Sequence, residues 1–187
     1  MSADWRDPWP LVGIRPEPPL PSVGLDRLRA DGYTVCFDVD AQQADRDRWQ
    51  DHVENTGIVR MFTEMRTAYT VARLAPDWPR FVRREGYTSL VREQHVRYDR
   101  EARMHERFVG GVRVAQRRGK AVVLEQALME AESGEPVAVA WLVQLLVGPD
   151  GRVTGYPDIF WNLVEKAEGG PIPAVDGVGP APWGPPS

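Results

Sequence analysis

A single long amphipathic helix is the feature of this sequence that most constrains the fold. Apolar residues recur at steps of three and four along one stretch, at Ile58, Met61, Phe62, Met65, Tyr69 and Ala72. This spacing lays one apolar stripe along a helix of about five turns. Asp51 and Glu54 have the D-x-x-E spacing of a capping box, which predicts that the helix begins near His52. The stripe needs an apolar surface to cover.

Five segments predict that this surface is a β-sheet, because they show alternating or continuous apolar residues. They are Tyr33–Asp40, Thr88–Asp99, Arg107–Arg118, Ala121–Glu132 and Pro136–Val147. The fourth segment also fits a helix. The fifth is apolar on both faces, which indicates the centre of the sheet. Paired glycines at 110 and 111 indicate a bulge or a close approach of another group to the backbone.

These elements predict one α+β domain over residues 33–167, in which the helix follows the first strand and an antiparallel meander of four strands follows the helix. Residues 1–32 form a proline-rich arm, and we expect Trp5 and Trp9 to dock it on the domain. Residues 168–187 form a Pro/Gly-rich tail that cannot hold a core. One helix cannot cover both faces of the sheet, so a second subunit should cover the other face.

Shorter segments are assigned from turn residues. Gly24–Gly32 predicts a short helical turn, and Ile159–Ala167 predicts another turn or two. Pro76–Gly86 predicts a loop, because the APDWP sequence breaks the central helix. Trp78 and Phe81 either pin this loop onto the core or make it a lid over a pocket.

Charge and composition exclude several classes of protein. A formal net charge of -4 argues against nucleic-acid binding. No apolar run approaches the roughly 20 residues of a membrane span, and the acidic start does not resemble a secretory signal. Cys36 is the only cysteine, which fits a reducing compartment, so we expect a cytoplasmic protein. His95 and His105 have no second His or Cys at ligand spacing, so no metal site is predicted.

The start of the predicted helix resembles a known family. The sequence D-H-V-E-N-T-G-I-V-R-M-F-T-E-M-R follows, without a gap, the pattern G-H-V-N-N-x-x-Y-x-x-x-F-E-E-A-R of the hot-dog-fold thioesterase superfamily. The matching residues are His52, Val53, Asn55, Phe62, Glu64 and Arg66. The similarity is to the branch of 4-hydroxybenzoyl-CoA thioesterase-like and acyl-acyl-carrier-protein thioesterase-like proteins. VRYDREARMHERFVGGVRV and VAVAWLVQLLVGPDGRVTGYPD resemble later strands of the family, so the resemblance covers Tyr33–Asp158.

The resemblance implies a hot-dog fold, in which the antiparallel sheet of about five strands wraps around one central helix, and a homodimer or homotetramer. It also implies hydrolysis of an acyl-CoA or acyl-carrier-protein thioester. Coenzyme A or phosphopantetheine would then be part of the substrate, with no separate cofactor and no membrane partner. Two alternatives stay open. They are a non-hydrolytic acyl-thioester binding or scaffold protein, and a dehydratase or hydratase on the same fold.

Thioester hydrolysis requires a base or nucleophile to deliver water and donors for the oxyanion. Exposed N-H groups at a helix start could supply the donors near Asn55 to Gly57. In the family an aspartate of a D-x-D element lies just before the helix. Here Asp45 and Asp47 stand one residue farther away, and Arg48 occupies the usual position. If the loop carries one inserted residue, Asp47 takes the catalytic position and Asp45 supports it; otherwise the acid is missing.

Other residues near the helix start have two interpretations. His52 is a general base or a structural histidine. Asp51 and Glu54 replace the family's glycine and first asparagine, and they are displaced acids or simply capping residues. Glu64 is a secondary candidate, because some branches of the superfamily place a catalytic glutamate in this helix.

A basic stretch, Arg92–Lys120, holds nine basic and four acidic residues. Arginines at strand ends could bind the phosphates of coenzyme A or phosphopantetheine. The candidates at turns are Arg100, Arg103, Arg117 and Arg118. Alternatively, these arginines are the solvated outer face of the strands.

Overall fold

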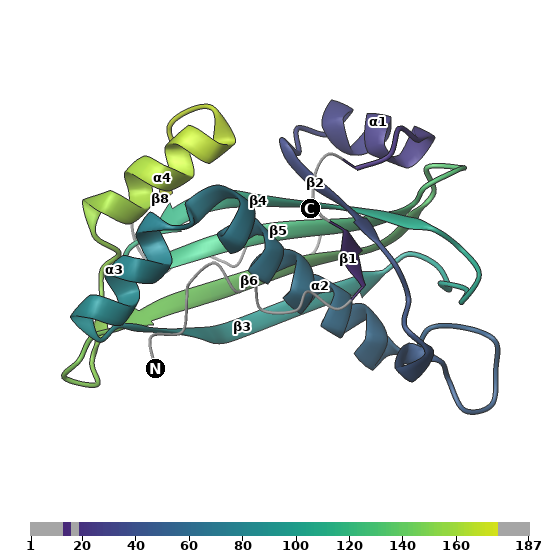
Figure 1. Ribbon diagram of the computed structural model, residues 1–187, viewed down its shortest axis with the longest axis horizontal. Helices are drawn as coiled ribbons and strands as arrows, with labels where there is room; N and C mark the ends of the chain where they lie inside the picture. The colour runs from purple at the N-terminus through teal and green to yellow at the C-terminus, as the bar shows by residue number, and fades with distance from the viewer. Residues whose placement is uncertain (1–12, 16–18, 176–187) are drawn as a thin grey trace.

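A mixed α+β domain is described by the computed structural model for residues 13–15 and 19–175; the expected docking of Trp5 and Trp9 lies outside these residues. The helical elements are α1 (Val23–Ala30), η1 (Gln43–Asp45), α2 (Asn55–Tyr69), η2 (Thr70–Leu74), α3 (Asp77–Glu85) and α4 (Asp158–Glu168). The strands are β1 (Ile14–Arg15), β2 (Val35–Val39), β3 (Thr88–Tyr98), β4 (Phe108–Arg118), β5 (Ala121–Glu130), β6 (Pro136–Val147), β7 (Val153–Thr154) and β8 (Ala174–Val175). Figure 1 shows α2 crossing one face of a long, twisted sheet.

The strands form one sheet in the order β1-β2-β4-β5-β6-β3, with β7 beside β6 and β8 beside β4. The five predicted strands are confirmed, and three two-residue strands raise the number to eight. The predicted meander is wrong for β3, which pairs with β6 and not with β4. A link over residues 99–107 carries the chain across the end of the sheet. The central position predicted for β6 is also wrong, because β4 and β5 lie nearer the middle.

The predicted apolar stripe is buried against the sheet from Ile58 to Tyr69, whereas Ala72, its predicted last residue, is exposed and lies in η2. Met61, Phe62 and Met65 are fully buried, and they share a core with residues of β2, β4, β5 and β6. Gln126 of β5 donates a hydrogen bond of 2.6 Å from Nε2 to the main-chain oxygen of Phe62. The position and the tilt of α2 on the sheet are therefore fixed by both apolar and polar contacts.

The loop predicted for residues 76–86 is wrong, because Asp77–Glu85 forms the helix α3. Pro79 lies in its first turn, where the backbone N-H groups have no partner inside the helix, so a proline is tolerated there. Trp78 is buried, with its ring centroid 5.8 Å from that of Phe81 and 4.8 Å from that of Phe160 in α4. These aromatic contacts join α3 to the core.

The two short helices predicted near the ends are confirmed as α1 and α4. Leu25 and Leu28 of α1 are buried against β4 and β5, in a cluster separate from the core under α2. The division into arm, domain and tail stays a prediction. Within the part of the chain that the structure describes, no helix combines the length and apolar composition that crossing a lipid bilayer requires.

The paired glycines of β4 mark a close approach on both faces of the sheet. A Cβ atom at Gly110 would overlap the sulphur of Met65 in α2, and one at Gly111 would lie 2.6 Å from the ring of Tyr33. The register shift in β4 lies elsewhere, between Val114 and Gln116. Of the two predicted explanations, close approach is therefore the one that applies.

We expect Gly111→Ala to lower the free energy of unfolding by about 1–3 kcal/mol, because the buried Tyr33 ring cannot move aside without strain. Urea-induced unfolding measures this change. Gly155→Ala is the matched control, because no described atom lies within 4 Å of a Cβ atom there. Equal stability of the two variants would contradict the packing argument.

Candidate active site

The loop before α2 is held by backbone pairing on two sides. Arg46 forms an antiparallel bridge with Val53, and the N-H of Asp47 donates to the oxygen of His52 at 2.9 Å. On the other side His52 bridges to Arg103, and the N-H of Val53 donates to Ala102 at 2.8 Å. The β3–β4 link and the loop before α2 therefore meet at His52.

The predicted capping box is wrong, and α2 begins at Asn55 instead of near His52. Backbone bridging keeps residues 52 and 53 extended, so they cannot start the helix. Asp51 pairs with Arg46 at 3.0 Å, and the side chain of Glu54 accepts a hydrogen bond of 3.0 Å from the Thr56 hydroxyl. Glu54 is the N-cap residue but makes no side-chain capping bond.

The first N-H groups of α2 therefore have no capping side chain among the described residues, and they lie at the positive end of the helix dipole. A hollow of about 260 Å³ lies at this end and is lined by Asp47, His52, Glu54, Asn55 and Thr56. Three of the predicted catalytic residues, Asp47, His52 and Asn55, are thus brought together. Gly57, predicted as a substrate-binding residue, is buried instead, where a Cβ atom would lie 2.6 Å from that of Asp45.

Asp47 is half-buried at the rim of this hollow. Its Oδ1 atom accepts hydrogen bonds from the N-H groups of Trp49 at 2.7 Å and Gln50 at 2.9 Å. The bond from Trp49, assisted by that from Gln50 and by nearby His52, holds the pKa of the Asp47 carboxyl below its ordinary 3.8. The carboxylate is therefore ionised at all physiological pH values.

Glu101 is a site residue that the sequence reasoning missed. Its Oε1 atom lies 3.2 Å from the Nδ1 atom of His52. This nitrogen atom is buried and makes no hydrogen bond in the described structure. A small rotation of the imidazole would make this contact a hydrogen bond, leaving Nε2 to accept a proton. The sequence offered one indication of this role: Glu101 is an acidic residue that follows Arg100 just after the end of the predicted strand Thr88–Asp99.

Asp45 does not line the hollow. Its carboxylate is 3% exposed and accepts two hydrogen bonds from Arg60 of α2, at 2.7 and 2.6 Å. The N-H of Gln42 donates a third at 2.7 Å. Asp45 thus ties the loop to α2 as a buried ion pair.

The remaining predicted residues are spread over the fold. Glu64 lies nine residues after Asn55, which is about 13 Å along the helix. Arg100 is engaged by Glu106 at 3.0 Å and by Glu135 at 3.5 Å. Arg103 is exposed beside His52.

Arg117 and Arg118 lie at the far end of β4, roughly 30 Å along the strand from Phe108. The guanidinium of Arg117 is 4.9 Å from the centre of the Trp161 ring. The predicted basic stretch is therefore split between the two ends of the sheet. As for metals, the described residues contain no group of three or more His, Cys, Asp or Glu side chains that could hold an ion.

We expect Asp45→Asn to lower the free energy of unfolding by about 3 kcal/mol, because it removes a buried carboxylate charge that accepts hydrogen bonds from Arg60 and from the N-H of Gln42. Asp51→Asn is the matched control, since its pair with Arg46 is exposed and should contribute less than about 1 kcal/mol. Chemical denaturation of both variants measures the difference. A loss as small in Asp45→Asn as in Asp51→Asn would contradict the structural role of the buried pair.

Comparison with solved structures supports this fold. A thioesterase from Thermus thermophilus, solved with coenzyme A and zinc, is 23% identical over 76% of this chain and 99% of its own, with a TM-score of 0.64. A thioesterase-superfamily protein from Jannaschia sp. CCS1 is 21% identical over 84% of this chain and 98% of its own, with a TM-score of 0.65. Slr0204, a 1,4-dihydroxy-2-naphthoyl-CoA thioesterase from Synechocystis, is 12% identical over 69% of this chain and 93% of its own, with a TM-score of 0.62.

No curated protein matches the chain significantly. The model of the thioesterase-like superfamily, however, matches residues 46–169. This match begins at the loop before α2 and includes the hollow, α2, α3, the four long strands and α4. With the hot-dog fold of its structural neighbours, it establishes that the chain belongs to the thioesterase-like superfamily.

Proposed function

We propose that this protein hydrolyses an acyl thioester in the hollow at the start of α2. The observation that supports this most directly is the uncapped first turn of α2, which faces a space lined by Asp47, His52 and Asn55. Backbone N-H groups at a helix start donate to a developing oxyanion without reorganising. The substrate carbonyl oxygen would lie over Asn55 and Thr56.

The reaction consists of one addition and one elimination. Water attacks the thioester carbonyl carbon while the base takes one of its protons, and the negative charge develops on the carbonyl oxygen near the helix start. The carbon-sulphur bond then breaks with its electron pair leaving on sulphur. The protonated base returns its proton to the thiolate, which gives a free thiol and a carboxylic acid.

Two groups are candidates for activating water. Asp47 lines the hollow, and its Oδ2 atom has no described hydrogen-bond donor, so it can hold water or act as a nucleophile. Its lowered pKa makes it a weak base. His52 with Glu101 behind it has the arrangement in which a carboxylate orients an imidazole for proton transfer. We favour His52 as the base, Glu101 as its positioning residue and Asp47 as the group that orients water.

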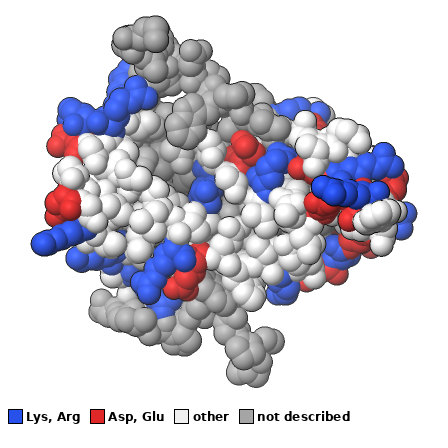
Figure 2. Space-filling model, turned by 90° about the horizontal axis from the view of Figure 1, so that it is seen from below, with Lys and Arg blue, Asp and Glu red and all other residues white. Residues whose placement is uncertain are grey.

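A homodimer is part of this proposal. β3 is an edge strand of the described sheet, and ten of its eleven residues are exposed, with Leu90 39%, Val91 42% and Tyr98 42% accessible. Figure 2 shows a broad belt of uncharged atoms along this side of the molecule, with charge densest at the end near the loop before α2. An exposed, partly apolar edge is a template for pairing with a second copy.

The substrate is most simply an acyl-CoA. A structural neighbour from Thermus thermophilus was solved with coenzyme A, and the Synechocystis neighbour is a CoA thioesterase. The exposed Arg103 beside the hollow is a candidate for a phosphate contact. An acyl-carrier-protein substrate presents the same phosphopantetheine arm, and a cytoplasmic location suits either substrate.

The hydrogen bonds of Asp47 favour a second candidate function, non-hydrolytic binding of acyl thioesters. Oδ1 of this carboxylate is occupied by the Asx-type turn to Trp49 and Gln50, so only one oxygen is left for water. A protein that holds the thioester without cleaving it would show binding and no turnover.

We expect the purified protein to release free thiol from acyl-CoA or acyl-pantetheine substrates. Replacing the proposed base in His52→Ala should lower kcat by about 100-fold or more, and Asp47→Asn should lower it by a similar factor. Thiol release is followed with a chromogenic thiol reagent. Asp51→Asn, which alters an exposed carboxylate outside the hollow, is the control with unchanged kcat.

Thioester binding without turnover across the panel would replace hydrolysis with the binding function. Undiminished turnover in His52→Ala would remove the assignment of the base while leaving hydrolysis intact.

The pH dependence distinguishes the two bases. The Asp47 pKa is lowered, so this carboxylate stays ionised until the pH falls below 3.8. If Asp47 activates water, kcat/KM should be flat between about pH 5 and pH 8. A fall toward acid within this range would exclude Asp47 as the base. Glu101→Gln should lower kcat without raising KM, because it removes the carboxylate that orients the His52 imidazole; an unchanged kcat would contradict the positioning role.

A further inference from the structure

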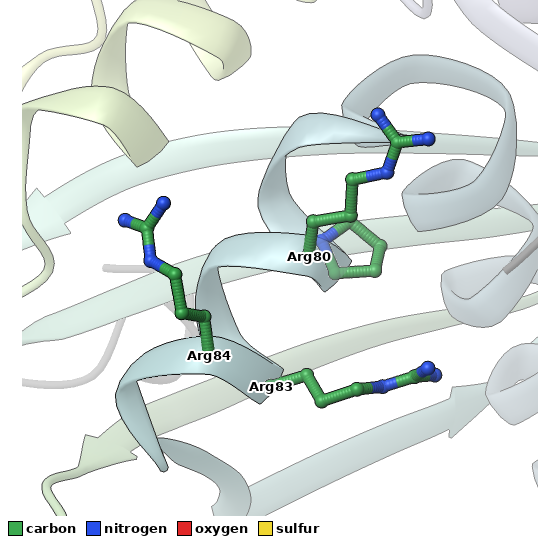
Figure 3. Close-up of a pocket in the computed structure, with 4 residues that line it drawn as sticks. Arg80, Arg83 and Arg84 are labelled. Atoms are coloured by element: carbon green, nitrogen blue, oxygen red, sulfur yellow. The ribbon is translucent and has the colours of Figure 1, made fainter. Parts of the chain in front are cut away.

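Three arginines of α3 line a second hollow, of about 180 Å³, but their charges already have contacts. Figure 3 shows Arg80, Arg83 and Arg84 reaching outward from this short helix. Arg84 pairs with Glu85 at 2.7 Å, and neither of the other two is without an interaction. A different arginine, Arg66 in the last turn of α2, stands in contrast to these three.

Arg66 is half-buried on the flank of the central helix. In the described structure its guanidinium group makes no ion pair and no hydrogen bond. Burial lowers the pKa of this group, and the neighbouring Tyr156 opposes the shift. A guanidinium stays charged in proteins, so here a cation is partly removed from water without an anion beside it. Such a charge is costly unless a ligand supplies the anion.

The hydroxyl group of Tyr156 is also unused. It is buried and has no hydrogen-bond partner among the described residues. Burial raises the pKa of this phenol, and the nearby side chains of Ser89, Gln144 and Arg66 lower it. The hydroxyl is therefore neutral at physiological pH and able to donate a hydrogen bond. A cation and a neutral donor that both lack a partner are the groups that a carboxylate requires.

One stripe of α2 connects the active-site hollow to this polar pair. Its residues follow one another at steps of three and four: Asn55, Val59, Thr63 and Arg66. The hydroxyl of Thr63 donates to the main-chain oxygen of Val59 at 3.0 Å, so the middle of the stripe has no unpaired polar group. Arg66 lies eleven residues after Asn55, about 16 Å along the helix, and its side chain leans back toward the helix start.

The face of β3 that points to the α2 side runs beside this stripe. At one end of the strand Tyr98 pairs with Ala138 of β6, and at the other end Ser89 pairs with Leu146. Both partners lie in the core under α2, so both β3 residues point to that side of the sheet. Ser89 approaches the hydroxyl of Tyr156, whereas the end of β3 leads into the link that reaches the hollow. Because ten of the eleven β3 residues are exposed, this face is open to an extended ligand.

We infer that the acyl group of the substrate ends in a carboxylate, which binds to Arg66 and Tyr156. This inference rests on the proposed function and names the substrate class of that site. The thioester carbonyl lies at the start of α2, and the acyl chain runs along Val59 and the α2-facing side of β3. The guanidinium then donates paired hydrogen bonds to the distal carboxylate, and the phenol donates another. The substrate class is the mono-thioester of a dicarboxylic acid.

Binding is tested with two CoA thioethers, which cannot be hydrolysed. One carries an unbranched alkyl chain, and the other carries a chain of the same length that ends in a carboxylate. We expect calorimetry to show roughly tenfold or more tighter binding of the carboxylate probe, and Arg66→Met to remove this preference. Arg29→Met is the matched control, because Arg29 is also in the last turn of its helix but is exposed. Equal affinity of the unmodified protein for both probes overturns the inference.

Stability and assembly separate a ligand site from a structural role. Arg66→Met should not lower the free energy of unfolding, since it removes a half-buried charge without a partner. Tyr156→Phe keeps the ring that packs on Trp78 and should weaken binding of the carboxylate probe alone. Arg66→Lys keeps the charge and should retain part of the preference. Loss of the dimer in Arg66→Met, measured by sedimentation, would show that a second copy supplies the anion and would overturn the inference.

Turnover separates this inference from the proposed function. Suberyl-CoA and octanoyl-CoA have the same chain length and differ in the terminal carboxylate. We expect a higher kcat/KM for suberyl-CoA and loss of this difference in Arg66→Met. Binding that depends on the carboxylate without turnover of either thioester would reject hydrolysis and leave the inference standing. Turnover of octanoyl-CoA with no preference for suberyl-CoA would do the reverse.

Discussion

Burial of the apolar stripe of α2 against the sheet is the constraint on which the rest of the structure depends. Met61, Phe62 and Met65 can be fully buried only when the helix lies close to β4, where Gly110 has no side chain to separate them. Close packing of this kind tolerates little displacement. It therefore fixes how α2 lies on the sheet, and with it the direction of the N-H groups that face the candidate active site.

The start of α2 is set by backbone pairing and not by a capping side chain. Val53 and His52 are extended because they bridge Arg46 on one side and the β3–β4 link on the other. The buried pair of Asp45 and Arg60 then holds the loop against the helix. Together these contacts leave the first N-H groups uncapped beside Asp47, where a substrate carbonyl could use them.

The connection between β3 and β4 has a further effect. Because β3 lies at the edge beyond β6, the link over residues 99–107 must cross the end of the sheet, and it brings Glu101 to His52. The same edge position leaves β3 open to a second copy. One topological feature thus supplies a proposed catalytic contact and the edge strand of the proposed dimer.

The sequence by itself determined the elements whose signal is local. The 3.6-residue period of α2 and the alternating or continuous apolar runs of the five longer strands indicated these elements, although the run of β5 also fitted a helix, and the motif from His52 to Arg66 indicated the family. Only the tertiary structure decided the partners of these elements. The D-x-x-E spacing of Asp51 and Glu54 predicted a cap, but backbone bridges from distant residues took precedence over it. Likewise, α3 forms after a proline-rich break because Trp78 is buried against α4, a contact between residues more than 80 positions apart that no local pattern encodes.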